Sequence, residues 1–190
     1  MEVYLIRHTS PKVEKGICYG QTDIPLLENF TQEAEKVIKN LPDQFDTIFT
    51  SPSSRCKELA KMLSGKELIL DNRLMEMNFG DWEMKKWNDI DQSILNAWMA
   101  DFVNIKATNG ESIVELNNRV SEFMEELSAK DYKRVAIVSH AGVIRSILVG
   151  ITEMPLSNAF KLTFDYGSVS KININRENCY KNVEFINKVN

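Results

Sequence analysis

The stretches Val3-Tyr4-Leu5-Ile6-Arg7-His8 and Val135-Ala136-Ile137-Val138-Ser139-His140 decide the fold of this 190-residue chain. Each is a short apolar run of the kind that forms a buried strand. The residues that close the two runs, His8 and His140, are the only two histidines in the chain. Side chains at the carboxyl ends of strands in an open α/β sheet face a ligand crevice. We therefore expect the two imidazoles to share one site.

Further strands and helices are predicted from the spacing of apolar residues. Apolar runs and alternating apolar and polar positions indicate strands at 45–49, 68–70, 169–174 and 183–186. Helical spacing connects two groups of residues: Ala34, Val37, Ile38 and Leu41, and then Ile113, Leu116, Val120, Phe123 and Leu127. Because strands and helices alternate along the chain, the α/β class is favoured.

Two helix starts carry capping signals. Ser51 is a candidate N-cap ahead of Pro52 at the first helical position. Ser112, with Glu115 three residues later, matches a capping box. These signals predict helices that begin just after the strand at 45–49 and just after residue 112.

Residues 81–108 differ from the rest of the chain. They contain all three tryptophans, and they show helical spacing without a strand signal; the residues concerned are Trp82, Trp87, Ile90, Ile94, Leu95 and Trp98. We interpret the segment, at about 81–108, as a helical insertion that caps the sheet. The chain has no linker or internal repeat, which predicts a single domain over residues 1–190.

Composition excludes several functional classes. The net charge is −4, and no dense run of lysine or arginine is present, so no nucleic-acid partner is expected. The sequence shows neither a signal peptide nor an apolar stretch that could span a bilayer, so no membrane association is expected. The three cysteines, at Cys18, Cys56 and Cys179, form no CxxC motif, which favours a reducing, cytoplasmic location.

Arg7 and His8 are suited to phosphate chemistry. A neutral imidazole nitrogen is a competent nucleophile, and a guanidinium group presents a charged fork that matches two phosphate oxygens. The alternative for an isolated Arg-His pair is a hydrogen-bonded structural histidine beside a surface arginine.

Arg55 lies in Thr50-Ser51-Pro52-Ser53-Ser54-Arg55, where a strand ends and a helix begins. The first turn of a helix offers unpaired N–H groups and a positive dipole end, both of which favour a bound anion. The alternative is a solvated arginine on a helix surface.

Glu76 and Glu83 are candidate proton donors in the segment from Leu74 to Glu83. Burial of Glu76 among apolar residues would raise its pKa, and a protonated carboxyl group can protonate a departing alkoxide. Glu83 is the second choice for this role. The alternative for either residue is a surface charge or a helix-dipole partner.

His140 is followed by Ala141 and Gly142, whose small side chains allow a ligand to approach closely. Backbone N–H groups after His140, beginning with that of Ala141, are expected to hold phosphate oxygens, and a protonated His140 would add a charged donor. The alternative is a histidine that merely ends a strand.

Four strings together resemble the histidine phosphatase (phosphoglycerate mutase-like) superfamily in order along nearly the whole chain: Leu5-Ile6-Arg7-His8-Thr9, Thr50 to Arg55, Leu74 to Glu83, and Val138-Ser139-His140-Ala141-Gly142. The resemblance implies a three-layer α/β/α sandwich with a mostly parallel sheet and no metal or other cofactor. It implies that His8 is the nucleophile that becomes phosphorylated and that Glu76 is the proton donor. Arg7, Arg55 and His140 would then hold the phosphoryl group.

The chain departs from the family pattern at two positions: Thr9 replaces the usual glycine, and Glu14 replaces an asparagine that many members carry. The second change replaces a residue that contacts phosphate in those members. The stretch from Arg7 to Leu26 is most similar to the α-ribazole phosphatase subgroup of cobalamin biosynthesis. Specificity is expected from residues 81–108 and from 9–26, with the mouth of the site formed by Tyr19, Gly20, Gln21, Thr22 and Glu83.

The function predicted on this basis is a phosphomonoester hydrolase acting on a small phosphorylated metabolite, with α-ribazole 5′-phosphate as the expected substrate. A broad-specificity sugar or metabolite phosphatase and a phosphoglycerate mutase are alternatives that use the same site. A phospholigand-binding module without catalysis is an alternative of another class, because a shared fold does not determine function. The sequence does not predict an oligomeric state.

Overall fold

The fold is built on one sheet. The computed structural model describes residues 1–178 and 180–189, so Cys179 lies outside the described residues. The strands are β1 (Glu2–Arg7), β2 (Thr47–Thr50), β3 (Leu68–Leu70), β4 (Arg134–Ser139), β5 (Val169–Ile174) and β6 (Lys181–Lys188). They form a six-stranded sheet in the order β3-β2-β4-β1-β5-β6. The first four strands in this order are parallel to one another, whereas β5 and β6 pair antiparallel. The predicted, mostly parallel sheet is confirmed.

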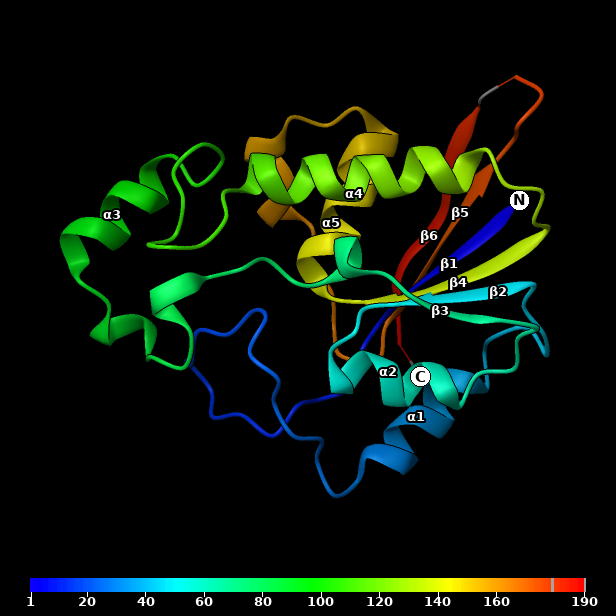
Figure 1. The fold of residues 1–190 in the computed structure, drawn as a ribbon, viewed down its shortest axis with the longest axis horizontal. Coiled ribbons are helices and arrows are strands. Elements are labelled where there is room, and N and C mark those ends of the chain that lie inside the picture. Colours follow the sequence, from blue (N-terminus) through cyan, green and yellow to red (C-terminus); the bar gives the residue numbers. More distant parts are fainter. Residues whose placement is uncertain (179, 190) are drawn as a thin grey trace.

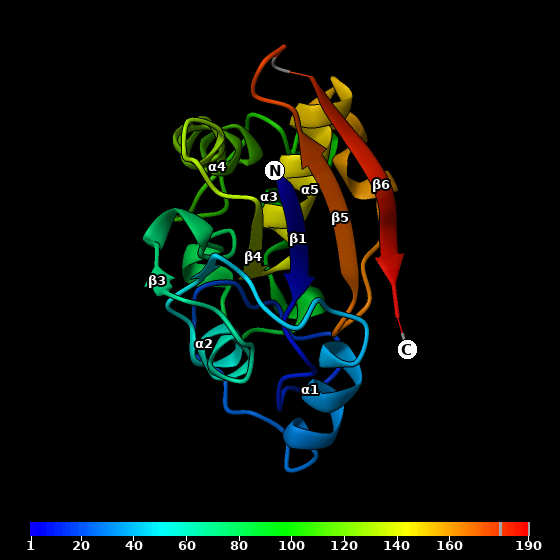
Figure 2. The ribbon, with the colours of Figure 1, turned by 90° about the vertical axis from the view of Figure 1, so that its right-hand side faces the viewer.

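Helices cover both faces of this sheet. Helices α1 (Phe30–Ile38) and α2 (Ser54–Lys61) lie against one face, and α4 (Ile113–Ser128) and α5 (Ala141–Thr152) lie against the other (Figures 1 and 2). Two separate clusters of buried apolar residues, one on each face, hold the layers together. The structure is therefore the three-layer α/β/α sandwich that the resemblance implied.

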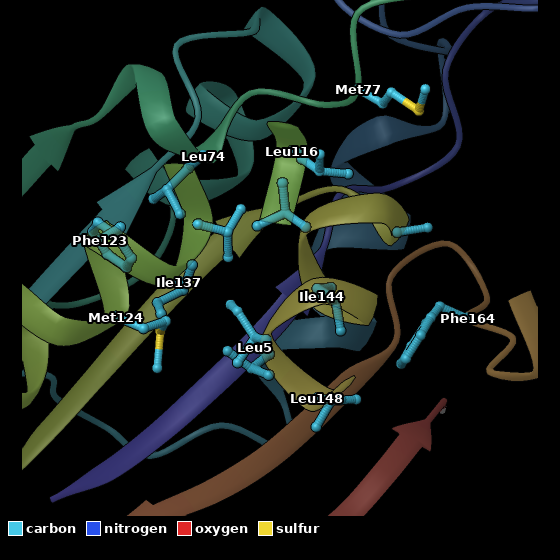
Figure 3. Packing of buried hydrophobic residues seen from close by; sticks show 14 of the residues in the cluster. Leu5, Leu74, Met77, Leu116, Phe123, Met124, Ile137, Ile144, Leu148 and Phe164 are labelled. Carbon is cyan, nitrogen blue, oxygen red and sulfur yellow. The ribbon is translucent and has the colours of Figure 1, made fainter. Parts of the chain in front are cut away.

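The alternation of side chains along the central strands produces the two apolar clusters. Leu5 on β1 and Ile137 on β4 are fully buried beneath Leu116 of α4 and Ile144 of α5 (Figure 3). The next residue on β1, Ile6, points to the opposite face and belongs to the cluster under α1 and α2. Each fully buried aliphatic side chain of this kind contributes about 1.5–3 kcal/mol to stability.

The register of β1 against β4 brings the two histidines together. Arg7 pairs with Ser139 at the carboxyl ends of these two parallel strands, and the His8 N–H continues the ladder by donating to the Ser139 carbonyl at 3.0 Å. His8 follows β1 directly, and His140 follows β4 as the N-cap of α5. Both imidazoles therefore start from adjacent strand ends.

The predicted start of the second helix was wrong by two residues. Helix α2 begins at Ser54 with Ser53 as its N-cap, so Ser51 is not the cap and Pro52 is not the first helical residue. The reason is that the Ser51 N–H donates to the Val138 carbonyl at 3.0 Å, so the chain at Ser51 still runs along β4 as β2 does and has not yet turned into the helix. Arg55 nevertheless lies in the first turn of α2, as predicted.

Other boundaries differ less. Strand β2 begins at Thr47, because Phe45 forms only an isolated bridge with Gly65, and helix α1 ends before Leu41. Strands β1, β4 and β6 differ from the predicted ranges by one or two residues at each end, while β3 and β5 match them. The capping box of Ser112 and Glu115 at the start of α4 is confirmed.

Residues 81–108 contain one α-helix, α3 (Gln92–Ala100), and 3₁₀ turns at Gly80–Trp82 and Trp87–Asp89. Two further 3₁₀ turns lie elsewhere, at Asn72–Leu74 and Leu156–Lys161. Helix α3 lies beyond the carboxyl ends of the parallel strands, away from the sheet (Figure 1). Trp82 and Trp98 pack edge to face with ring centroids 5.6 Å apart, whereas Ile94 is 43% exposed and does not join the core. The segment therefore extends the apolar core past the strand ends through its aromatic side chains.

Two remaining observations concern cysteines and hydrophobic helices. Cys18 and Cys56 are buried and form no disulfide. Among residues 1–178 and 180–189, no helix combines the length and apolar character needed to cross a bilayer.

We predict that Ser112→Ala lowers the free energy of unfolding by about 1 kcal/mol, because the Ser112 hydroxyl accepts a hydrogen bond from the Glu115 N–H at the start of α4. Urea denaturation measures the change. The matched control is Ser128→Ala at the other end of the same helix, where the hydroxyl donates to the Met124 carbonyl and caps no N–H group. An equal loss in both variants would contradict the capping role.

Candidate active site

His8 is held in one tautomer. It is 2% exposed, and its Nδ1 lies 2.7 Å from the Thr9 carbonyl oxygen. A carbonyl can only accept a hydrogen bond, so Nδ1 must carry the proton in the neutral ring. The lone pair is then on Nε2, which is the nitrogen available to attack a substrate.

The surroundings of His8 keep this ring neutral. Burial is the main cause that moves the pKa of His8 well below its ordinary value of 6.5, and the positive charges of Arg55 and Arg7 lower it further. The hydrogen bond to the Thr9 carbonyl acts in the opposite direction but does not outweigh these effects. At neutral pH the imidazole is therefore unprotonated.

His140 lies beside His8. The two ring centroids are 5.1 Å apart at an interplanar angle of 64°, and the Ser51 hydroxyl lies 2.9 Å from His140 Nε2. Burial moves the pKa of His140 well below 6.5, and the nearby His8 and Arg55 add to the decrease. In the ligand-free protein these effects favour the neutral form of His140. A bound dianion would offset the surrounding cations and raise the proton affinity of this ring.

Arg7 and Arg55 supply the positive charge of the site. Arg7 Nη1 donates to the Phe164 carbonyl, and Arg55, which is fully buried, donates through its two Nη atoms to the carbonyls of Gly20 and Thr22. The Nε atom of each arginine is buried without a hydrogen-bond partner among the described residues. Buried donors are nearly always paired, so two orphaned guanidinium donors beside His8 indicate a place for an acceptor such as a phosphate oxygen.

The predicted mouth residues lie around Arg55 and Glu83. The Glu83 carboxylate accepts hydrogen bonds from the N–H groups of Gln21, Thr22 and Phe79 and from the Thr22 hydroxyl. Burial raises the pKa of Glu83, but these four donors outweigh it and the pKa falls below the ordinary value. Glu83 is thus an anchor of the loop over 19–22 rather than a second proton donor.

Glu76 occupies a position that suits a proton donor. Its carboxylate accepts hydrogen bonds from the N–H of Met77 at 2.9 Å and from the N–H of Gly142 at 3.2 Å. The second contact places it at the start of α5, next to His140. Glu76 is partly buried.

Arg119, which sequence analysis missed, fixes the segment that carries Glu76. Its guanidinium on α4 donates to the carbonyls of Arg73, Met75 and Glu76 and pairs with Glu111. One side chain thus clamps three carbonyls of an irregular segment. A lone arginine in a predicted helix gives no sequence signal of such a role.

Tyr166 was also missed. Its ring lies 3.8 Å from the Arg7 guanidinium carbon, which is a cation–π contact, and its ring centroid lies 5.5 Å from that of His8. Its hydroxyl and that of Tyr19 are 2.6 Å apart. The turn at Gly167, where φ is +69° and the N–H donates to the His8 carbonyl, brings Tyr166 over the site.

Several details differ from the expected anion cradle. The Ser54 N–H and hydroxyl at the start of α2 both donate to Asp23 Oδ1, so a carboxylate of the protein occupies this helix terminus. The N–H of Gly142, one residue past Ala141 on α5, is used by Glu76. Glu14 is exposed in the loop after β1. In the described part of the chain, no group of three or more histidine, cysteine or acidic residues has the arrangement of a metal site.

We predict that neither histidine titrates at pH 6.5 in the ligand-free protein. Because both pKa values are lowered, protonation begins only at more acidic pH, and proton NMR of the two C2–H signals, assigned with a His140→Asn variant, measures this directly. The unfolded chain binds these protons near pH 6.5 and the folded chain does not, so stability should also fall as pH falls below 6.5. A midpoint at or above 6.5 for His8 would contradict the proposed environment.

Three kinds of comparison agree on the family. The family model for the "Histidine phosphatase superfamily (branch 1)" matches residues 3–187. The "Putative phosphoserine phosphatase 2" of Hydrogenobacter thermophilus is 30% identical to this chain, with 92% of this chain and 90% of the relative covered. The "Adenosylcobalamin/alpha-ribazole phosphatase" of Salmonella typhimurium is 31% identical, with 92% and 91% covered.

A solved structure shows the same architecture. The alpha-ribazole phosphatase from Shigella flexneri superimposes with a TM-score of 0.86 at 27% identity, covering 99% of this chain and 96% of the other. A neutral buried histidine, two guanidinium groups and a nearby carboxylate are groups that suit phosphoryl transfer. The chain belongs to the histidine phosphatase superfamily, branch 1, and is a phosphatase.

Proposed function

We propose that the chain hydrolyses a phosphomonoester of a small metabolite through a phosphohistidine formed on His8. The observation that carries the proposal is the state of His8 Nε2. This nitrogen is unprotonated because Nδ1–H is bonded to the Thr9 carbonyl, and it lies beside two guanidinium groups with unpaired donors.

In the first step, Nε2 of His8 attacks phosphorus and the ester P–O bond breaks. The leaving oxygen takes a proton from Glu76 and departs as an alcohol. The ring gains positive charge as the N–P bond forms, and the Thr9 carbonyl at Nδ1–H stabilises that charge. In the second step water attacks phosphorus and gives its proton to Glu76, the N–P bond breaks, and inorganic phosphate leaves.

Arg7, Arg55 and His140 stabilise the charge on the phosphoryl oxygens during both steps. This electrostatic contribution dominates phosphoryl transfer, provided that the donors are in place before reaction. Backbone carbonyls and Tyr166 hold Arg7 and Arg55, and Ser51 holds His140. The donors are therefore preorganised.

For the substrate we propose α-ribazole 5′-phosphate as the first candidate. The support is the similarity of the stretch from Arg7 to Leu26 to that subgroup, together with the names of the Salmonella and Shigella proteins. Phosphoserine is the second candidate, favoured by the name of the Hydrogenobacter relative. The cytoplasmic location, the lack of a nucleic-acid partner and the single domain stay predictions of the sequence.

Two alternatives use the same site and differ from a hydrolase in their outcome. A phosphoglycerate mutase would transfer the phosphoryl group to a second hydroxyl, so it would release isomerised product in place of phosphate. A binding module would never become phosphorylated. Free phosphate release, measured beside covalent labelling of the protein, distinguishes the three.

We predict that His8→Ala abolishes phosphate release, with a loss of at least about 10³-fold in kcat/KM, because no other residue supplies the nucleophile. Wild-type protein mixed with ³²P-labelled substrate and quenched under alkaline conditions should carry acid-labile label on His8. Retained hydrolysis in His8→Ala would refute the mechanism.

We predict that Gly142→Ala lowers kcat by about 10-fold or more, because a Cβ at this position would lie 2.2 Å from Glu76 Oε1 and displace the proton donor. The matched control is Gly150→Ala on the same helix, where a Cβ would meet nothing within 4 Å. The control should keep full activity and gain up to about 1 kcal/mol of stability from helix propensity. Equal activities of the two variants would contradict the placement of Glu76.

A further inference from the structure

The arginines divide into two groups by their partners. Of the seven in the chain, four pair with a carboxylate in the described residues: Arg73, Arg119, Arg134 and Arg176. The other three, Arg7, Arg55 and Arg145, have no carboxylate partner within 4.0 Å there. Two of these three hold the phosphoryl group in the proposed mechanism. Arg145 has no assigned role.

Arg145 shares a backbone segment with Arg7. Its Nε donates to the Leu162 carbonyl at 2.9 Å, and Arg7 Nη1 donates to the Phe164 carbonyl. Leu162 is extended, with φ −89° and ψ 120°. The two guanidinium groups are therefore held by carbonyls two residues apart in the chain, and the charge of Arg7 acts on Arg145.

Arg145 also lies on the same face of α5 as Gly142, whose N–H holds Glu76. Gly142 and Arg145 are three residues apart on α5, so they lie on the same face, and the Gly142 N–H binds Glu76. Arg145 thus starts one turn further along α5 than the contact that holds Glu76, and its charge interacts with that of Glu76. The rings of Phe160 and Phe164 flank its guanidinium at 5.3 and 5.8 Å.

The free-energy cost of burying the Arg145 cation without an anionic partner indicates a ligand. Burial lowers the pKa of Arg145, while the charge of Glu76 opposes and that of Arg7 reinforces the decrease. A partly buried cation without an anionic partner is unfavourable, and proteins normally pair it. The Nη atoms of Arg145 make no hydrogen bond with the described residues, so its charged fork remains available.

We propose that Arg145 determines specificity by binding a carboxylate on the leaving group. The substrate class is then a small phosphomonoester that carries a carboxylate near the ester oxygen, such as phosphoserine or a phosphoglycerate. The guanidinium fork matches a carboxylate with two parallel hydrogen bonds. The inference rests on the proposed function and bears on its choice of substrate: it favours the second candidate, phosphoserine, over α-ribazole 5′-phosphate, whose leaving group carries no carboxylate.

The test compares two substrates that differ only at the proposed contact. 3-Phosphoglycerate carries a carboxylate where glycerol 3-phosphate carries a hydroxymethyl group. The wild-type protein should prefer 3-phosphoglycerate in kcat/KM. Arg145→Gln should lower that value by about 10- to 100-fold, mostly through KM, and should change the value for glycerol 3-phosphate by less than about threefold. Arg145→Lys should restore part of the preference, because it restores the charge.

Arg176→Gln is the matched control, since Arg176 pairs with Asp131 and takes no part in the site. An equal loss for both substrates in Arg145→Gln would overturn the inference, because it would show that Arg145 acts on Glu76 or on the fold. No preference for 3-phosphoglycerate in the wild type would overturn it as well.

A binding measurement separates this inference from the proposed function. Calorimetric titration of the His8→Ala protein with each substrate needs no turnover. Tighter binding of 3-phosphoglycerate that disappears when Arg145→Gln is added supports the inference, even if no phosphohistidine forms in the wild type. Equal affinities for the two ligands would overturn it, even if hydrolysis through His8 is established.

Discussion

The parallel pairing of β1 with β4 is the constraint on which the site depends. This pairing places Arg7 opposite Ser139, and the residues that follow each strand are the two histidines. Neither histidine could reach the other if the register slipped, because a shift of one residue turns every side chain to the opposite face of the sheet. The buried residues on both faces of β1 and β4 oppose such a shift. The same apolar packing that stabilises the fold therefore sets the distance between the imidazoles.

The site concentrates positive charge in a place where water is largely excluded. Burial and the neighbouring guanidinium groups disfavour a bound proton and so keep both histidines neutral. A neutral imidazole is the form that can act as a nucleophile. The cations themselves are supported by neutral groups: backbone carbonyls and the ring of Tyr166. Had carboxylates paired with Arg7 and Arg55, they would have competed with phosphate. The absence of such pairs within the described residues is the electrostatic basis of the anion binding that we propose.

Much of the fold was predictable because its signals are local. Apolar runs marked the central strands, and Ser112 with Glu115 marked the start of α4, since capping depends on residues three positions apart. The N-terminus of α2 was not predictable, because the Ser51 N–H belongs to a sheet contact with Val138 that lies far away in sequence. The use of Glu83 as a loop anchor was missed for the same reason, because it depends on donors that folding brings in.

The sequence by itself determined which groups were available: two histidines at strand ends, arginines beside them, and a glutamate in an apolar segment. It also determined the class of fold, through periodicities that need no knowledge of distant residues. Only the tertiary structure decided which groups meet, how the His8 proton is placed, and which arginines are left without a carboxylate. The physical reason is that pKa, tautomer and ion pairing depend on burial and on neighbours within a few ångströms. Those neighbours come from segments separated by up to about 160 residues along the chain, as in the contact of Arg7 with Tyr166.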